Sequence, residues 1–366
     1  MTGIDTIPQR LAEADAETLF DELAARIARA VPFDASLFFG TDPATLLATF
    51  PARIDGVANN QCFAYWQREF LVEDVNLFHD LARGPIPAAT LWSATESLPA
   101  RSARYREFLR PERFGDELRV AFRVASSTWG VASLMRGAGR PPFTADETAL
   151  VAALSEPVGH ALRRAALTRP PRPLPAPKAP GLMLFDHDGE LLSANNEARL
   201  WLGELHEPPI GPRPLGRALP TEVVGVLARA RAVADGRSSA PARVRLRSPD
   251  GRWLLLHATP LHDTEGEQGS VAVVLEPARS EEIAPIIVEA YALTPREQQV
   301  TSLIARGAGT ADIAATLFLS PHTVRDHVKA VFEKVGVSTR GELTAKLFAE
   351  HYAPPLRATA RHVDGE

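Results

Sequence analysis

Residues 293–352 have the sequence LTPREQQVTSLIARGAGTADIAATLFLSPHTVRDHVKAVFEKVGVSTRGELTAKLFAEHY, and this stretch decides the fold of the last part of the chain. Apolar residues recur in it at helical spacing in four short segments, each with a helix-start signal. The sequence TPRE at 294–297 provides an N-cap, a proline at the first helical position and a capping-box glutamate. Gly307 and Gly336 stop the first and third segments. The stretch therefore predicts an all-α domain of four helices.

The second and third segments are separated by a very short turn. Thr310 is the predicted N-cap of the second helix, residues 318–319 form the turn, and Ser-Pro at 320–321 opens the third helix. A capping-box sequence at 339–342 starts the fourth helix. Two helices joined by so short a turn are typical of a helix-turn-helix unit that binds DNA.

The third predicted helix has two different faces. One is apolar, and its members are Val324, Val328, Val331 and Val335. The opposite face carries His322, Arg325, Asp326 and Lys329. Arg and Lys donate to guanine in the major groove, whereas Asp accepts from a cytosine amino group; alternatively, Asp326 holds Arg325 in place. Hydroxyl groups and free amides near the helix start suit phosphate oxygens. The candidate DNA contacts are Thr310, Ser320, His322, Thr323, Arg325, Asp326, His327, Lys329 and Lys334.

Three segments carry a family resemblance, namely 293–300, 309–328 and 331–343. Together they resemble the LuxR-type DNA-binding domain, which quorum sensors and many response regulators share. The resemblance implies a helix-turn-helix at 310–329 with base contacts from Arg325, Asp326 and Lys329. It also implies that the fourth helix supplies dimer contacts, for which the candidates are Leu343, Leu347 and Phe348. Asp326 stands where many members have a neutral or basic residue, which implies an operator particular to this chain.

Without this resemblance, a polar row on a helix is more simply a solvated face. The caps and the resemblance favour DNA contact. His322 and His327 are interpreted as backbone or phosphate partners rather than metal ligands.

The composition limits the class of protein. The 366 residues suffice for two or three domains, and the 45% hydrophobic and 23% charged fractions are ordinary for a soluble globular protein. No run of about 18 apolar residues occurs, so we expect no membrane-spanning helix. The first residues lack the features of a secretory signal, and the single cysteine, Cys62, allows no internal disulfide and has no partner thiol for redox sensing. These features predict a cytoplasmic protein.

The charges are distributed unevenly. Residues 292–366 carry nine basic and eight acidic groups, whereas residues 1–168 carry 17 and 21 and residues 169–291 carry 14 and 16. The chain has four lysines, and none precedes Lys178. A phosphate-binding P-loop needs a Gly-Lys-Ser/Thr triplet, which the sequence lacks, and a phospho-receiver domain needs a lysine that the first part lacks. We therefore expect neither.

Two breaks divide the chain. Residues 169–180, RPPRPLPAPKAP, hold six prolines and predict a semi-rigid extended linker. A softer break precedes the C-terminal helices. The predicted organisation is a sensor domain at 1–168, the proline-rich linker at 169–180, a second domain at 181–277, a linker at 278–289, the helix-turn-helix domain at 290–352 and a disordered tail at 353–366.

The first predicted domain mixes helix and strand signals. Residues 11–30 have helical spacing, strand pairs flank the turn at 41–43 and lie within 118–135, and a capping box starts a helix at 144–167 that Pro157 is expected to kink. Helices around an antiparallel sheet make an α+β fold. The segments 102–122, 129–130 and 141–154 resemble the GAF-like sensor regions of actinobacterial LuxR-type regulators.

Aromatic residues of this domain suggest a pocket for a small apolar ligand. The candidates are Tyr65, Trp66, Phe70, Asp74 and Trp92. Four of them roughly follow the aromatic and acidic spacing of acyl-homoserine-lactone pockets, although Phe70 replaces the usual Tyr and no Asp-Pro follows. The alternative is that these aromatic residues form ordinary hydrophobic core.

The second predicted domain begins with GLMLFDHDGELLSAN at 181–195, two strands joined by an Asp-Gly turn. Helices at 196–205 and 221–234, a hairpin within 244–261 and a strand at 270–275 follow. The element order and the opening segment resemble a PAS domain, again α+β.

Two metal or cofactor alternatives arise in the second domain. Asp186-x-Asp188-Gly189 is similar to the start of a calcium loop, but the later ligands are missing, so a hairpin turn is favoured. Four histidines offer a haem ligand without one being singled out, namely His187, His206, His257 and His262. We predict no metal and no cofactor.

These features predict a dimeric, sequence-specific transcriptional regulator whose N-terminal domains sense a ligand or a partner. The expected partners are double-stranded DNA, a second copy of the chain and a small apolar ligand. The alternative is a signalling scaffold with a weak or vestigial DNA-binding domain, which the nearly neutral C-terminal charge favours. Acidic residues of the first domain join no nucleophile or metal set, so we expect no enzyme.

Overall fold

The protein is represented by a computed structural model that describes residues 18–57, 65–66, 68–168, 179–203, 205, 219–248, 252–262, 268–279, 282–283, 286 and 289–349, without the side chains of 50, 51, 167, 168, 268 and 345–349. Most of the proline-rich linker, Cys62, His206 and the predicted tail lie outside the described residues. The chain divides into two compact units, Met1–Pro277 and Ala278–Glu366.

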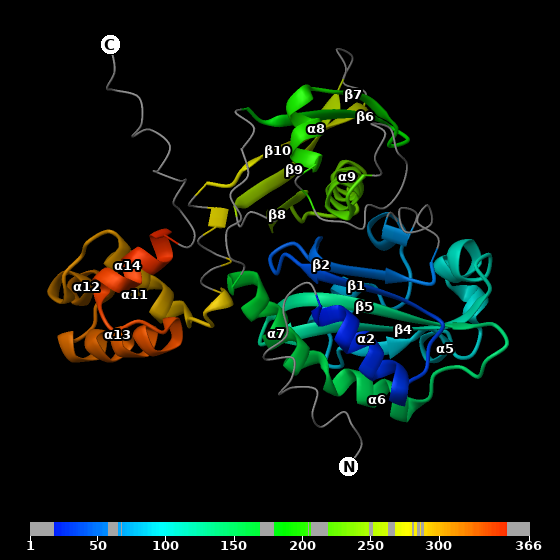
Figure 1. Ribbon diagram of the computed structural model, residues 1–366, viewed down its shortest axis with the longest axis horizontal. Helices are drawn as coiled ribbons and strands as arrows, with labels where there is room; N and C mark the ends of the chain where they lie inside the picture. Colours follow the sequence, from blue (N-terminus) through cyan, green and yellow to red (C-terminus); the bar gives the residue numbers. More distant parts are fainter. Residues whose placement is uncertain are drawn as a thin grey trace, which may run out of the picture. The chain divides into compact units, whose positions relative to one another are not determined.

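The first unit contains a five-stranded antiparallel sheet (Figure 1). In sheet order its strands are β2 Ala48–Asp55, β1 Ala35–Thr41, β5 Ser127–Gly137, β4 Phe114–Val124 and β3 Ala88–Thr90. The two predicted strand pairs are confirmed, because β1 pairs with β2 and β4 pairs with β5. Strand β1 is buried along its whole length, so both faces of the sheet are covered.

Helices cover the two faces of this sheet. On one face lie α2 Leu19–Ala30, α6 Ala145–Ala153 and α7 Ser155–Thr168 (Figure 1). The opposite face packs α4 Phe78–Arg83 and the π-helical turn η2 Tyr105–Leu109, while α5 Leu91–Ala94 and the short η1 Pro99–Arg101 follow β3. The predicted α+β architecture of this part is confirmed.

The predicted helix at 144–167 is interrupted rather than kinked. Its capping box is present, since Glu147 N donates to Thr144 Oγ1 at 3.2 Å and Thr144 N to Glu147 Oε2 at 2.8 Å. The helix ends at Ala153 and α7 begins at Ser155. Pro157 explains the interruption, because it has no N–H to donate to the carbonyl of Ala153.

A second five-stranded antiparallel sheet follows, with strands β7 Leu191–Ala194, β6 Gly181–Asp186, β10 Gln268–Pro277, β9 Trp253–His262 and β8 Arg243–Arg247 in sheet order. Its helices are α8 Asn196–Gly203 and α9 Thr221–Ala234. The strand order repeats that of the first sheet. Between β6 and β7, the Asp186 carboxylate accepts from the N–H groups of Asp188 and Glu190, at 2.9 and 2.8 Å, so the segment is the predicted hairpin turn.

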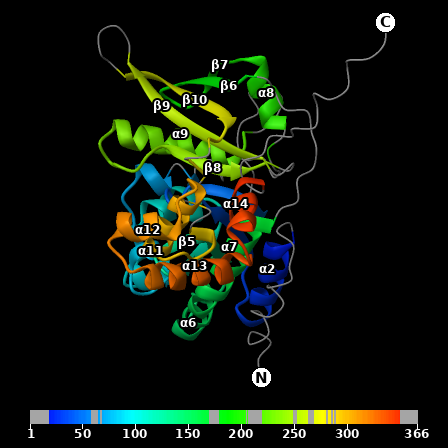
Figure 2. The same ribbon diagram turned by 90° about the vertical axis from the view of Figure 1, so that its left-hand side faces the viewer.

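Helix α9 lies between the two sheets of the first unit (Figures 1 and 2). It contacts β9 and β10 on one side and β2 on the other, and residues 221–232 are all buried. A Cβ on Gly225 would lie 3.4 Å from Leu47 of the first sheet's β1–β2 turn. Beside this contact, Arg245 of β8 forms an ion pair with Asp42 of the same turn. One continuous hydrophobic core therefore serves both sheets.

The second unit contains α11 Pro295–Ala305, α12 Thr310–Leu317, α13 Pro321–Val335 and α14 Arg340–Ala349. The four predicted helices are thus confirmed, with one correction. The N-cap of α12 is Gly309, whose N–H donates to Asp312 Oδ2 at 3.1 Å, and Thr310 is the first helical residue. In the described part of the chain, no helix has the length and apolarity needed to span a membrane.

Candidate functional site

The structure brings together three of the five residues predicted to line a ligand pocket. Tyr65 and Trp66 are each only 1% exposed and lie against the first sheet. The Trp66 ring stacks on Phe70 at a centroid distance of 6.0 Å and meets Phe39 of β1 edge-on at 5.0 Å. These rings form a continuous aromatic layer between the sheet and its covering segments.

The other two candidates have different environments. The Asp74 carboxylate accepts from Ser102 Oγ at 2.9 Å and from the backbone N–H of Arg104 at 2.7 Å, so it belongs to a polar cluster. Trp92 is 36% exposed, and its backbone N–H donates to Asp116 Oδ1 at 2.9 Å. Neither residue has a ring contact with the aromatic layer among the contacts of the described residues.

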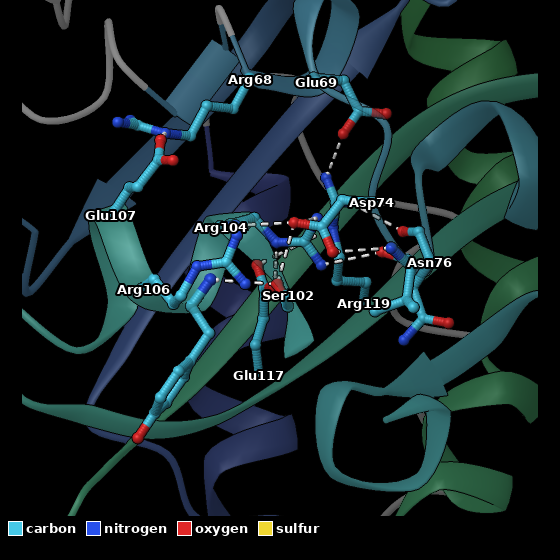
Figure 3. A network of polar contacts seen from close by, with 12 residues as sticks. Arg68, Glu69, Asp74, Asn76, Ser102, Arg104, Arg106, Glu107, Glu117 and Arg119 are labelled. Atoms are coloured by element: carbon cyan, nitrogen blue, oxygen red, sulfur yellow. Dashed lines mark hydrogen bonds and ion pairs between the residues drawn. The ribbon is translucent and has the colours of Figure 1, made fainter. Parts of the chain in front are cut away.

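A buried polar network lies beside the aromatic layer (Figure 3). Glu117 of β4 is at its centre. It accepts from Tyr65 Oη at 2.9 Å, Ser133 Oγ at 2.6 Å and Arg104 Nε at 2.7 Å. Arg119, two residues further along the same face of β4, donates to Glu69 Oε2 at 2.6 Å. The network joins the sheet to the segments that cover it.

The network keeps its charged groups ionised despite their burial. Desolvation acts to raise the pKa of Glu117, but Arg104 and Arg119 outweigh it and hold that pKa below its usual value. Desolvation likewise acts to lower the pKa of Arg119, but its neighbours, chiefly Glu69 together with Tyr65 and Glu117, outweigh it, so the pKa of Arg119 is raised. Burial raises the pKa of Tyr65, which keeps its hydroxyl protonated as a donor. The Arg119 guanidinium also lies 3.6 Å from the centre of the Phe78 ring.

Sequence reasoning missed this network. Its signal is the alternation Glu117-x-Arg119 inside an otherwise apolar strand, since residues two apart lie on the same face. Charges on the buried face of a strand require buried partners. In the described residues, no group of three or more His, Cys, Asp or Glu side chains could hold a metal ion. The network therefore has a structural role, because it links the first sheet to the segments that pack on it.

The second unit places its third helix on a compact core. Val324, Val331 and Val335 of α13 are buried at 0–2% exposure, together with Val300 of α11 and Ile313 of α12. The N-cap Ser320 accepts from Thr323 N at 3.1 Å, and Gly336 ends the helix at a positive φ of 68°. The core therefore fixes which side of α13 faces outward.

The outward side of α13 is the predicted polar face. The side chains of His322 and Asp326 are 80% and 66% exposed, and His322 Nδ1 lies 2.9 Å from Asp326 Oδ2. Lys329 is 80% exposed, with its Nζ 4.0 Å from Glu333 Oε1. Arg325 is exposed, and no contact of the described residues engages its guanidinium. The interpretation that Asp326 holds Arg325 is wrong in this structure, since His322 is the partner that Asp326 has.

Two segments of the chain match known protein families. Residues 291–347 match the model of the luxR family of bacterial regulatory proteins, and residues 179–282 match the PAS fold. Residues 291–347 form a LuxR-type helix-turn-helix domain. The second sheet, with its two helices, is a PAS fold, so the predicted multidomain layout is confirmed in both places.

Curated relatives of the LuxR-type domain are regulators by name. The transcriptional regulatory protein UhpA of Escherichia coli is 46% identical over 56 residues, which are 15% of this chain and 29% of that protein. The uncharacterized transcriptional regulatory protein YhcZ of Bacillus subtilis is 44% identical over 62 residues, 17% of this chain and 28% of that protein. The chain thus spans less than a third of the length of these relatives.

A solved structure also resembles the chain distantly. It is the GAF domain/HD domain protein from Geobacter sulfurreducens, which is 19% identical and covers 43% of this chain and 95% of its own, with a TM-score of 0.29. At that TM-score the likeness supports no comparison of site or function.

Two predicted DNA contacts have structural partners inside the LuxR-type domain. Lys334 Nζ donates to Glu297 Oε2 at 2.6 Å and to the carbonyl of Ala292 at 3.1 Å, so it joins the end of α13 to the start of α11. Desolvation acts to raise the pKa of Glu297, but Lys334 and the hydrogen bonds with Thr294 together outweigh it, so that pKa is lowered. Thr310 Oγ1 accepts from Arg340 of α14 at 2.8 Å. Lys334 and Thr310 therefore both join helices within the domain, and their contact with DNA stays a prediction.

The predicted dimer contacts of α14 divide in the same way. Leu343 is 0% exposed and packs in the core of its own LuxR-type domain, so its side chain has no free surface for a second copy. The side chains of Leu347 and Phe348 lie outside the described residues. Leu343 lies one turn after Thr339, which caps the start of α14, and on the helix face that packs against the core.

Proposed function

We propose that the protein is a sequence-specific transcriptional regulator that binds double-stranded DNA through α13, in response to a signal sensed by the first unit. The observation that carries the proposal is the outward stripe of His322, Arg325, Asp326 and Lys329 on a core-fixed helix of a LuxR-type domain. A helix docked in the major groove reads bases through such a stripe. The names of the relatives, which are transcriptional regulatory proteins, support this assignment. The proposal includes no catalytic reaction.

The proposal includes a homodimer and a ligand. Two-fold operators are bound by dimers of helix-turn-helix domains, and a nearly neutral domain needs a second contact for tight binding. A ligand is supported by the buried indole N–H of Trp66 and the hydroxyl of Thr45, for which no partner exists among the described residues. Buried polar groups of this kind are normally satisfied by water or a bound molecule.

Binding-site selection from random duplex DNA, using the full-length protein, tests the assignment. The expected result is one enriched motif with two related half-sites, and Lys329→Ala is expected to weaken binding to it about tenfold. Arg110→Ala, in the first unit, is the control, because it removes an exposed positive charge away from the LuxR-type domain. Selection of no motif would leave the scaffold alternative, in which the first unit binds a partner and the LuxR-type domain is vestigial.

The ligand is tested separately by thermal unfolding in a panel of apolar compounds that carry a carbonyl group. A compound that raises the melting temperature of the wild type is expected to lose most of this effect on Trp66→Phe, which keeps the ring and removes the N–H donor. An equal shift in both proteins would remove Trp66 from the site.

A further inference from the structure

Asp326 places a negative charge in the middle of the exposed stripe of α13. A carboxylate in the major groove is repelled by the phosphates and has no proton to donate to guanine O6 or N7. Its favourable partner there is an exocyclic amino group, chiefly N4 of cytosine. An acidic residue at this position therefore limits the DNA sequences that α13 can bind.

His322 holds the Asp326 carboxylate in one direction. The two side chains are 80% and 66% exposed, so surrounding packing does not position them. Their hydrogen bond spans one helical turn, with Nδ1 and Oδ2 2.9 Å apart. It occupies Oδ2 and leaves Oδ1 as an acceptor that no contact of the described residues uses. Exposed pairs of this type add little to helix stability, so the pair has no evident structural purpose.

The neighbouring side chains supply the complementary donors. Arg325 is adjacent in sequence and exposed, and Lys329 lies one turn beyond it. Both suit guanine O6 and N7. The stripe thus presents one acceptor among donors, which matches a cytosine close to guanines.

We propose that Asp326 selects a cytosine at one operator position through the N4 amino group, with His322 as its positioning residue. This inference rests on the proposed function. Beyond that function, the inference names the base that Asp326 recognises and assigns His322 the role of orienting Asp326.

Site selection with full-length variants tests the choice of base. Asp326→Ala is expected to lose a preference of about tenfold at one position of each half-site while the other positions stay unchanged. Asp326→Asn is expected to change the preferred base there from cytosine to adenine, since an amide pairs with adenine N6 and N7. Asp146→Ala is the control, because Asp146 is an exposed carboxylate at the start of α6, in the first unit, and no contact of the described residues engages its side chain. It is expected to keep the wild-type motif.

The role of His322 needs a readout that a structural role would not change. His322→Ala is expected to weaken the preference at the Asp326 position several-fold while binding to non-specific DNA stays constant. His322→Gln is expected to restore the preference, because its amide can donate to the carboxylate. A uniform loss of affinity for all sequences, or an unchanged motif, overturns the positioning role.

The two levels of the proposal fail differently. A wild-type protein that enriches a motif which Asp326→Ala leaves intact at every position overturns this inference and leaves the proposed function standing. A wild-type protein that enriches no motif overturns both.

Discussion

Arg245 of β8 and Asp42 of the β1–β2 turn join the two sheets of the first unit through three hydrogen bonds. Arg245 Nε and its backbone N–H donate to Asp42 Oδ2 at 2.9 Å each, and a terminal guanidinium nitrogen donates to Oδ1 at 2.6 Å. The two side chains are only 9% and 1% exposed. A bidentate pair of this kind, removed from water, gives the contact between the sheets a defined geometry.

Loss of this pair should destabilise the first unit. Asp42→Ala removes the carboxylate that accepts three hydrogen bonds from the buried Arg245, and the expected loss is about 3 kcal/mol in the free energy of unfolding. Urea unfolding followed by tryptophan fluorescence measures it. Arg101→Ala removes the exposed Arg101–Glu96 pair as a control and should change the stability by less than about 0.5 kcal/mol. Equal effects of the two variants would contradict the importance of burial.

The network around Glu117 should respond to single and double substitution differently. Arg119→Met leaves Glu69 buried and unpaired, with an expected loss of about 3–5 kcal/mol. Adding Glu69→Gln removes the unpaired charge, so the double variant should recover about 1–3 kcal/mol relative to the sum of the single effects. A double-mutant cycle by chemical unfolding checks this. Strict additivity would show that the two residues do not interact energetically.

Glu222 of α9 should make stability fall as the pH rises. Burial raises its pKa to about 7 in the folded chain. In the unfolded chain the pKa of a glutamate carboxyl is about 4.3. Between these pH values the folded state binds a proton that the unfolded state has released, so stability decreases with increasing pH. The loss is complete above about pH 7 and amounts to about 4 kcal/mol.

Glu222→Gln removes this titration. It should be more stable than the wild type at pH 8 and close to it at pH 4.5, as measured by urea unfolding at both pH values. Glu73→Gln, at an exposed position, is the control and should leave the pH dependence unchanged. A wild type and a Glu222→Gln variant with the same pH dependence would refute the assignment to this carboxyl.

Two lysines of α13 should have separable effects. Lys329→Ala should lower the slope of binding against salt concentration by about one without changing stability, because its ammonium is exposed and faces outward. Lys334→Met should leave that slope unchanged and lower the stability of the LuxR-type domain by about 1 kcal/mol, since it breaks the bond to Glu297. Fluorescence anisotropy on a selected operator, over a range of salt, and thermal unfolding separate the two. A changed salt slope in Lys334→Met would show that this lysine contacts DNA.

Local signals predicted most of the elements. Helix α9 has the predicted bounds, 221 to 234, and the capping boxes at Thr144 and Thr294 are present as expected. Such features depend on residues within one or two turns, and the sequence contains them in full. The exposed stripe of α13 follows in the same way from its buried valines.

Features that depend on distant residues were not predicted. The partners of Glu117 include Tyr65, which lies 52 positions away, and Lys334 meets Glu297 37 positions away. The sequence predicts a DNA contact for Lys334, whereas the fold gives its ammonium a carboxylate partner. Leu343 was assigned to a dimer contact from the resemblance alone, while the core of its own domain covers it.

The two arginines in the last turns of α9 show the same limit. Arg229 and Arg231 suggest a solvent face, yet both are buried at 6% and 9% exposure. Arg229 lies over the Phe70 ring at 4.4 Å and donates to the carbonyl of Thr45 in the β1–β2 turn of the first sheet. The periodicity of a helix does not predict that a second sheet packs on its polar face.

The enclosed position of α9 limits how this protein can evolve by exchange of parts. A helix that is buried from residue 221 to residue 232 has no surface of its own to keep when one neighbouring sheet is replaced. Recombination at the proline-rich segment would therefore leave half of that helix facing water, with its valines and alanines unmatched. The two sheets of the first unit are therefore expected to be exchanged only as one part.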